Sequence, residues 1–398
     1  MKKIVVIILM LTVFALPGMG FIYNANANQG NTAEESGKYI KLAGGLNGSE
    51  NIQVTRSGIL SYMNKDFDKL TRGMLASLMG QNGDIWFPEE VPVSFKSKIY
   101  EPDVSYRVAL SLNGDLSESE YFTGNNDYPG QSDGAEGCIF ISNLMVGKKY
   151  YYRIEATTKS EKTYYSLTGS FTTDATPARW ISLSGSISNT RDIGGWQTES
   201  GQIVKQGLIY RGGRIQETNG VSVISEEVAD YIVDKLAIKT DVDLRGVYGD
   251  MVTATKSIGG KINFLSVPIY AYEDALTNNT TAVNIKRIFD TMSKQSNYPL
   301  YIHCSAGADR TGTLVFIING LLGVSYENLL RDFELTSFSD QTIRYRDDDM
   351  IAVYNAINKY GTDRGAANFS ESCEKWLCEY VGVSSENIAA VKNILLED

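Results

Sequence analysis

The chain has 398 residues, which is longer than one ordinary domain, so its length predicts at least two. Apolar residues make up 43% and charged residues 21%, a composition that can fill a packed core and excludes a wholly disordered chain. The formal net charge of −10 argues against nucleic acid or an anionic membrane as a partner, because those surfaces attract clustered Lys and Arg. An anion-binding site would therefore have to be formed locally, by a few donor groups that point at the anion.

The first 27 residues have the pattern of a signal peptide. Lys2 and Lys3 precede an apolar run at 4–16, and residues 25–27 (Ala-Asn-Ala) offer a cleavage site with small residues. An uncleaved membrane anchor is the alternative, but the run is shorter than the roughly 20 apolar residues of a spanning helix. The sequence therefore predicts a secreted or cell-surface protein with no membrane span after cleavage.

Cysteine and histidine are scarce in this chain. The four cysteines are too few for the disulfide framework of a small secreted domain, so Cys138, Cys373 and Cys378 are expected to be idle thiols. His303 is the only histidine, which excludes a metal site with two histidine ligands. We expect no metal or other cofactor.

Residues 28–83 are predicted to be an N-terminal extension with one helix. Asn, Gly and Ser dominate its first half, and no periodicity is visible there. Phe67, Met74 and Leu78 then fall at helical spacing before Gly80. The helix is expected to serve in packing.

Residues 84–175 have the pattern of a β-sandwich. Short segments rich in β-branched and aromatic residues alternate with turns that contain Gly, Asn, Asp and Pro. The turn from Leu144 through Gly147 to Tyr150 resembles the tyrosine corner of fibronectin type III domains, in which the tyrosine hydroxyl bonds upstream backbone. The resemblance implies a fibronectin III-like sandwich with a binding or spacer role.

Residues 177–398 alternate strands with helices. Amphipathic helices are predicted at 226–236 and 282–294, between extended apolar segments at 208–210, 240–244, 262–269 and 299–304. Such alternation is typical of an α/β domain with a mostly parallel central sheet covered on both faces.

One segment of this domain has the pattern of an anion site. An apolar strand delivers Cys304, a short turn follows, and Arg310 opens an apolar helix. Amides at the start of a helix and the helix dipole favour a phosphate, and Arg310 adds a planar fork of donors. The backbone can curl around the oxygens because the turn is made of small residues and one acidic residue, namely Ser305, Ala306, Gly307, Ala308 and Asp309.

The same groups would activate Cys304. Thiols at helix N-termini near a cation have a pKa lowered to about 3.5–7.5, so a thiolate is expected at neutral pH. It would attack phosphorus in line and form a phosphocysteine that water hydrolyses. A buried structural cysteine beside a surface arginine and a rhodanese-like sulfur-transfer loop are the alternatives, and both fit the strand, turn and helix less well.

The proton donor for the leaving group stays open on this reasoning alone. Asp309 in the turn, Asp274 after the strand at 262–269, and Asp243 at the end of the strand at 240–244 are the candidates. His303 should point away from Cys304, because adjacent strand residues face opposite sides. We expect His303, Thr311 and Asp243 to support the turn without touching the substrate.

The segment 303–312 (His-Cys-Ser-Ala-Gly-Ala-Asp-Arg-Thr-Gly) resembles the signature of bacterial tyrosine and dual-specificity phosphatases. Three further pieces match in order, namely Asn-Thr-Arg-Asp-Ile-Gly-Gly at 189–195, Gly-Leu-Ile-Tyr-Arg-Gly at 207–212 and Asp-Val-Asp-Leu-Arg at 241–245. The resemblance implies Cys304 as nucleophile, Arg310 as phosphate clamp and Asp309 as acid. Family members that act on phosphoinositides often carry Lys where this chain has Ala308.

The expected substrate is therefore a phosphorylated protein, through phosphotyrosine, or a small phosphomonoester. An inositol-phosphate or phosphoinositide phosphatase using the same loop is one alternative. A catalytically silent extracytoplasmic binding module is the other, and the intact Cys304, Asp309 and Arg310 argue against it.

Overall fold

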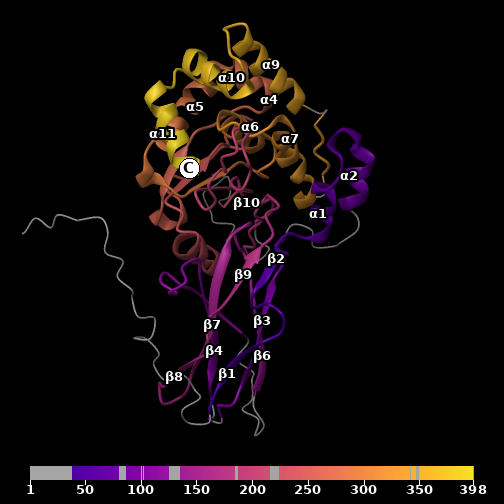
Figure 1. Cartoon of the computed structure of the whole chain (residues 1–398). Coiled ribbons are helices and arrows are strands. Elements are labelled where there is room, and N and C mark those ends of the chain that lie inside the picture. Colours follow the sequence, from indigo (N-terminus) through magenta and orange to yellow (C-terminus); the bar gives the residue numbers. More distant parts are fainter. Residues whose placement is uncertain are drawn as a thin grey trace, which may run out of the picture.

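The computed structural model describes residues 38–79, 87–99, 101, 103–124, 135–183, 187–215, 224–340, 342–346 and 349–397. The expected signal peptide at 1–27 lies outside these residues. The described chain forms a β-rich part and an α/β part, which stand end to end in Figure 1.

The β-rich part consists of two sheets that share one core. The smaller sheet has the order β1-β3-β6 and the larger one β2-β9-β7-β4-β5, with β8 beside β7. Alternate side chains enter the core from both sheets, among them Val93 and Phe95 of β3 and Val108 and Ile154 of the larger sheet. The strands are β1 (Ile40–Ala43), β2 (Ser49–Ile52), β3 (Val91–Ser97), β4 (Ser105–Ser111), β5 (Glu120–Thr123), β6 (Ala135–Ile141), β7 (Lys149–Thr157), β8 (Thr163–Tyr165) and β9 (Gly169–Thr173).

The turn before β7 is closed by a tyrosine hydroxyl. The amide of Met145 donates to the hydroxyl of Tyr150 at 2.8 Å, and Gly147 has a φ of +64° between them. A side chain thus bonds backbone that precedes it in the same turn, and Tyr150 also stacks on Phe171 of β9.

The prediction for residues 28–83 was wrong in two respects. Strands β1 and β2 of this segment belong to the two sheets, so it is not an appendage of the sandwich. It also contains two α-helices, α1 (Ser57–Met63) and α2 (Arg72–Met79), with a 3₁₀ turn (Phe67–Lys69) where the single helix was expected to begin. The strands escaped notice because they are only four residues long, which is too short for a periodic signal.

The α/β part is built on a five-stranded sheet of order β10-β11-β14-β12-β13. The pairs β11–β14, β14–β12 and β12–β13 are parallel, whereas β10 runs antiparallel to β11. The sheet is therefore mostly parallel, as predicted, and β14 lies at its centre. The strands are β10 (Arg191–Asp192), β11 (Ile209–Gly212), β12 (Thr240–Asp243), β13 (Asn263–Ser266) and β14 (Leu300–His303).

Helices cover this sheet and supply most of its core. Helix α6 is buried along nearly its whole length, because apolar side chains occupy all of its faces. The helix predicted at 226–236 is α-helical only to Asp230 and continues as a π-helical turn to Lys235. The helices are α3 (Glu226–Asp230), α4 (Tyr272–Thr277), α5 (Asn279–Met292), α6 (Asp309–Leu321), α7 (Tyr326–Leu335), α8 (Ser337–Asp340), α9 (Met350–Thr362), α10 (Phe369–Lys375) and α11 (Ser385–Leu395).

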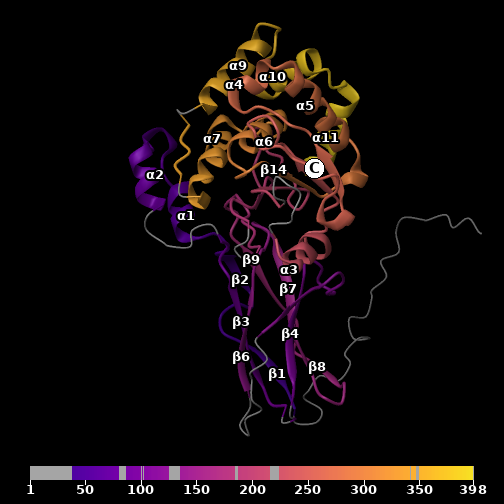
Figure 2. The ribbon, with the colours of Figure 1, turned by 180° about the vertical axis from the view of Figure 1, so that it is seen from behind.

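Helices α1 and α2 lie beside α7 in both views (Figures 1 and 2), although they precede most of the sandwich in the sequence. Within the described residues, no helix combines the length and apolar character that crossing a bilayer requires.

Candidate active site

Three loops meet at the carboxyl edge of the parallel sheet. In register, Gly212 of β11 and Asp243 of β12 both lie beside His303, the last residue of β14. The residues after each strand therefore converge at one place, which is where open α/β sheets form their binding crevices. Cys304 follows β14 directly, and α6 begins at Asp309, so the segment 304–310 forms a loop between strand and helix at this edge.

The loop requires glycine at position 307. Gly307 has a φ of +68°, and a Cβ there would lie 2.2 Å from the carbonyl oxygen of Gly212. A larger residue would therefore suffer both backbone strain and a clash with fixed backbone. The neighbouring Ala308 is fully buried, so position 308 presents no side chain to solvent.

Two side chains hold the carbonyls of the loop from outside. The side-chain amide of Asn189 donates to the carbonyls of Gly307 at 2.9 Å and Ala306 at 3.3 Å, and Nη2 of Arg211 donates to that of Gly307 at 2.8 Å. In a trans peptide the N–H points opposite to the C=O. With these carbonyls drawn outward, the amides of Gly307 and Ala308 turn toward the inside of the loop, where an anion would bind.

A buried carboxylate fixes these supports in turn. Asp332 of α7 pairs with Arg211 at 2.6 Å and with Arg191 at 3.1 Å, and both guanidiniums are inaccessible to solvent. Arg191 also donates to the side chain of Asn189. Burial alone would raise the pKa of Asp332, but the two guanidiniums outweigh it and hold the pKa below its usual range.

The surroundings of Cys304 favour its thiolate, which is the nucleophilic form. Its side chain is almost buried, which by itself would raise the pKa of the thiol. The charge of Arg310, the hydroxyl and amide of Thr311 and the amide of Gly307 outweigh that effect and lower the pKa below its ordinary value. At neutral pH the thiolate form of Cys304 is therefore more populated than that of an ordinary cysteine.

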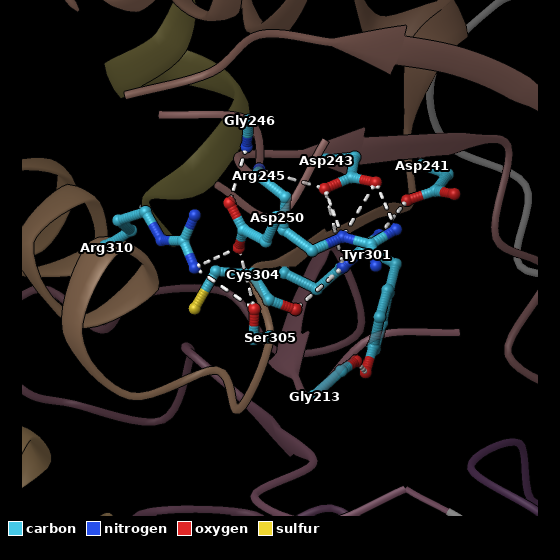
Figure 3. A network of polar contacts seen from close by, with 11 residues as sticks. Gly213, Asp241, Asp243, Arg245, Gly246, Asp250, Tyr301, Cys304, Ser305 and Arg310 are labelled. Carbon is cyan, nitrogen blue, oxygen red and sulfur yellow. Dashed lines mark hydrogen bonds and ion pairs between the residues drawn. The ribbon is translucent and has the colours of Figure 1, made fainter. Parts of the chain in front are cut away.

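Arg310 turns back over the loop and is held by Asp250. Its Nη2 donates to Oδ2 of Asp250 at 2.7 Å, and the hydroxyl of Ser305 donates to the same oxygen at 2.9 Å (Figure 3). The amide of Gly246 donates to the other oxygen of Asp250 at 2.9 Å. Nη1 of Arg310 is buried and has no hydrogen-bond partner among the residues that the structure describes. This nitrogen is therefore a donor that a bound anion could use.

His303 lies behind the loop. Its Nε2 lies 2.9 Å from a carboxylate oxygen of Asp241, and its Nδ1 lies 3.2 Å from the carbonyl of Cys304. Burial alone would lower the pKa of His303, but Asp241 and Asp243 raise it to about 9. The imidazolium can therefore donate to the carbonyl of Cys304, which fixes the first peptide of the loop.

The three candidate acids have different surroundings. Asp309 accepts from the hydroxyl of Tyr272 at 2.5 Å and from Nε of Arg344 at 2.9 Å, and its side chain stays 40% exposed. Asp243 is fully buried in an ion pair with Arg245 at 2.7 Å. Both oxygens of Asp243 accept hydrogen bonds from Arg245, so it is less suited to protonate a leaving group than an exposed carboxylate, and it lies beside His303.

The third candidate, Asp274, is exposed in the first turn of α4. No interaction between Asp274 and the loop 304–310 is found among the described residues. Tyr272, two residues earlier, is the residue of α4 that contacts the loop, through Asp309. Of the three carboxylates, Asp309 is therefore the one that lies in the site and remains accessible.

Sequence reasoning missed Asp250 and Arg344. Both lie in segments without periodicity, and their contacts are with residues 60 and 35 positions away. The segments 189–195 and 207–212 had been identified without a role, and Asn189 and Arg211 within them bind the loop carbonyls. Their position inside segments that match the family was the available signal.

Together these groups form a cradle of amides and one guanidinium around a sulfur of lowered pKa. Such a cradle stabilises the charge that spreads over phosphate oxygens during transfer. The site can therefore catalyse cleavage of a phosphoester by an attacking thiolate.

The chain is similar to known phosphatases in sequence. The model of a tyrosine phosphatase family matches residues 182–397. Among solved structures, the core catalytic domain of the PP-IP phosphatase Siw14 from S. cerevisiae, in complex with citrate, is 18% identical over 39% of this chain and 87% of that chain, with a TM-score of 0.26. A second structure of the Siw14 catalytic core is 16% identical over 38% and 87%, with a TM-score of 0.25.

Among curated protein sequences, none matches this chain. The family match covers more than half of the chain and includes every residue of the loop 304–310 and all the side chains that support it. The chain therefore belongs to the tyrosine phosphatase family and is a cysteine-dependent phosphatase.

Proposed function

We propose that this phosphatase hydrolyses phosphomonoesters through a phosphocysteine on Cys304 and that phosphotyrosine in proteins is its preferred substrate. The Cys304 thiolate forms a bond to phosphorus while the bond to the ester oxygen breaks. Asp309 in its protonated form gives a proton to the departing phenolate. Water then attacks phosphorus and gives a proton to the ionised Asp309, the P–S bond breaks, and phosphate and the thiolate are released.

An aromatic ring beside Arg310 supports the proposed preference for an aryl phosphate. The Tyr248 ring lies 5.2 Å from the Arg310 guanidinium and is 54% exposed. It is fixed by an edge contact with Tyr270 and by the amide of Ala271, which donates to its hydroxyl at 3.1 Å. A flat, rigid ring next to the phosphate site suits a phenyl group, because aromatic rings pack favourably against each other.

Charge near the site favours a substrate with a single phosphate. Asp250 lies on Arg310, and Glu273 and Asp274 are exposed in the first turn of α4, beside the Tyr272 that contacts the loop. A polyanion such as an inositol polyphosphate would be repelled by these carboxylates. Position 308, where Lys occurs in relatives that act on phosphoinositides, is a buried alanine here.

The test is a rate profile for the full chain with phosphotyrosine peptides, phosphoserine peptides and inositol phosphates. We expect the highest kcat/KM for phosphotyrosine and a loss of about 10⁴-fold or more in Cys304→Ser. A higher kcat/KM for inositol phosphates would transfer the proposal to the alternative substrate class. Equal phosphate release by the wild type and Cys304→Ser would contradict the thiolate mechanism, and no release by a folded wild type would favour a silent binding module.

We also propose that the β-sandwich is fibronectin III-like and that the N-terminus directs export. The bond from the amide of Met145 to the hydroxyl of Tyr150 supports a fibronectin III-like sandwich, since a tyrosine tied to upstream backbone is a hallmark of that architecture. The apolar run at 4–16 with its flanking lysines supports export to the extracytoplasmic side. N-terminal sequencing of the secreted protein would test the export, with a start at residue 28 as the expected result.

A further inference from the structure

The segment 56–79, which contains α1 and α2, packs as part of the phosphatase core. Ile59, Tyr62 and Leu75 have no solvent exposure, and they belong to the core that α6 and α7 share, not to the core of the sandwich. Figures 1 and 2 place α1 and α2 against α7. This segment lies far outside residues 182–397, the part that matches the family. It is thus an element of this chain that covers a phosphatase surface.

A buried carboxylate on α7 joins the two parts. Glu334 has no solvent exposure and accepts from the hydroxyl of Tyr62 at 2.6 Å. It also accepts from Nε of Arg346 at 2.7 Å and from Nη2 of Arg346 at 3.0 Å. Tyr62 and Arg346 therefore share one anion.

The same segment also contacts residues 345 and 346 directly. The guanidinium of Arg346 lies 3.4 Å from the centre of the Phe67 ring and donates to the carbonyl of Phe67 at 3.2 Å. The hydroxyl of Tyr345 donates to the carbonyl of Leu70 at 2.8 Å. Two consecutive side chains of the phosphatase domain thus end on the N-terminal segment.

The residue just before these two reaches the catalytic loop. The backbone amide of Arg344 donates to the hydroxyl of Ser337 at 2.7 Å, and its carbonyl accepts from that hydroxyl at 2.9 Å. Its side chain donates to both oxygens of Asp309, at 2.9 and 3.4 Å. The path from the N-terminal segment to Asp309 therefore consists of adjacent residues of one short stretch of chain.

We propose that the segment 56–79 is a positioning element of the active site, which holds Tyr345 and Arg346 and thereby keeps Arg344 on Asp309. Arginine has a long side chain with many rotamers, and anchoring the backbone on one side restricts where its guanidinium can lie. The role of Asp309 as proton donor rests on the proposed function, whereas the placement of Arg344 does not.

Because charged and hydrogen-bonding groups surround Asp309, its pKa reports directly whether Arg344 is in place. Asp309 faces Arg344 from the stretch 342–346, Tyr272 from the start of α4 and Arg310 from its own loop. Partial burial alone would raise the pKa of Asp309, but the bonds from Arg344 and Tyr272 outweigh it and lower the pKa. If Arg344 is released, the pKa of Asp309 should rise toward its ordinary value.

The experiment compares single side-chain truncations in the full chain. Tyr345→Phe loses the bond to Leu70, and Phe67→Leu loses the stacking on Arg346. Tyr106→Phe is the matched control, because its buried hydroxyl bonds Ser97 inside the sandwich. The Asp309 carboxyl is titrated by ¹³C NMR, with Asp309→Asn for assignment, and kcat is measured for a poor and an activated leaving group.

We expect Tyr345→Phe and Phe67→Leu to raise the pKa of Asp309, which moves the falling limb of the pH profile to higher pH. The maximum of kcat for the poor leaving group should fall by about 3- to 10-fold, since small displacements of catalytic groups are costly. KM and the activated substrate should change little, and Tyr106→Phe should match the wild type. Folded variants with the wild-type titration and kcat ratio would overturn the proposal. A shifted titration with no leaving-group effect in any variant, Asp309→Asn included, would uphold the positioning and refute the acid role.

Discussion

The carboxylate of Asp250 lies 2.7 Å from the guanidinium of Arg310 and 2.9 Å from the hydroxyl of Ser305, so one anion holds both ends of the catalytic loop. Burial alone would raise the pKa of Asp250, but the hydrogen bond from Arg310 and the other donors outweigh it and lower the pKa far below its usual range. Asp250 is therefore ionised at every pH at which the enzyme is expected to work.

Replacing Asp250 by Ala should impair substrate binding. Arg310 would lose the charge-assisted bond that holds its guanidinium over the loop, a bond worth about 1.5–3 kcal/mol, which corresponds to a fall in kcat/KM of about 10- to 100-fold. Most of the loss should be a higher KM, measured with an aryl phosphate. Asp250→Asn keeps the acceptor and should lose less. If Asp250→Ala bound phosphate more tightly than the wild type, the carboxylate would instead be a competitor for the site.

Replacing Tyr248 by Leu should weaken the preference for aryl phosphates. The ring stands beside Arg310, and aromatic contacts of this kind are worth about 0.5–1.5 kcal/mol, which is roughly 2- to 10-fold in kcat/KM. The rates for an aryl and an alkyl phosphate should be compared, and only the aryl rate should fall. Tyr121→Leu, which removes another half-exposed tyrosine in β5, is the control. Equal losses on both substrates would mean that Tyr248 supports Arg310 and does not contact the substrate ring.

Replacing Thr311 by Val should raise the pKa of Cys304. The Thr311 hydroxyl is one of the groups that lower the pKa of this thiol against the effect of burial. Only the thiolate reacts, so the activity of the wild type rises as pH increases through this lowered pKa. In Thr311→Val that rise should shift to higher pH, which the pH dependence of alkylation by iodoacetate measures. Thr313→Val, whose hydroxyl bonds the carbonyl of Asp309, should titrate like the wild type.

The other limb of the pH profile should report Asp309. A general acid works only while it is protonated, so activity on poor leaving groups falls as pH rises through the pKa of Asp309. Because Arg344 and Tyr272 hold this pKa below its ordinary value, the optimum should lie on the acidic side of neutral. Asp309→Asn should remove this limb and slow poor leaving groups by about 10²-fold or more. An unchanged limb in Asp309→Asn would assign it to another group.

Replacing Asp332 by Asn should destabilise the fold. The change leaves the buried guanidiniums of Arg191 and Arg211 without an anion, a loss of about 3–5 kcal/mol in the free energy of unfolding. Because the pKa of Asp332 is lowered in the folded state, its stabilisation is present at neutral pH and is lost as pH falls through that pKa. Urea denaturation measures both effects. Asp230→Asn, which breaks an exposed pair with Lys261, should cost less than about 1 kcal/mol.

The architecture of residues 177–398 follows from local patterns. Apolar strands and amphipathic helices alternate there, and each of the predicted strands at 208–210, 240–244 and 299–304 lies in the parallel sheet. The catalytic loop was also visible, because the strand, the Cys, the Gly, the Arg and the helix are contiguous. A contiguous motif needs no knowledge of tertiary contacts.

The residues that bind this motif from elsewhere in the chain could not be predicted from the sequence in the same way. Asp250 and Arg344 meet Arg310 and Asp309 only after loops of irregular conformation have closed, and neither residue carries a local signature. The same limit applied to β1 and β2, which are four residues long and are stabilised by pairing with distant strands. Nor does any property of α1 and α2 alone indicate that α7 is the surface that they cover.

Two of the described segments that connect the sandwich with the phosphatase domain lie next to each other. One leaves after β2 toward α1, and the other leaves after β9 toward Trp180, which bridges to Arg191. Asp174 joins the two segments, because its carboxylate accepts from the amide of Val54 at 2.9 Å and its own amide donates to the carbonyl of Ile52 at 2.9 Å. Because these two segments are joined by hydrogen bonds, the sandwich cannot rotate about one backbone bond of either segment without breaking the contacts of Asp174.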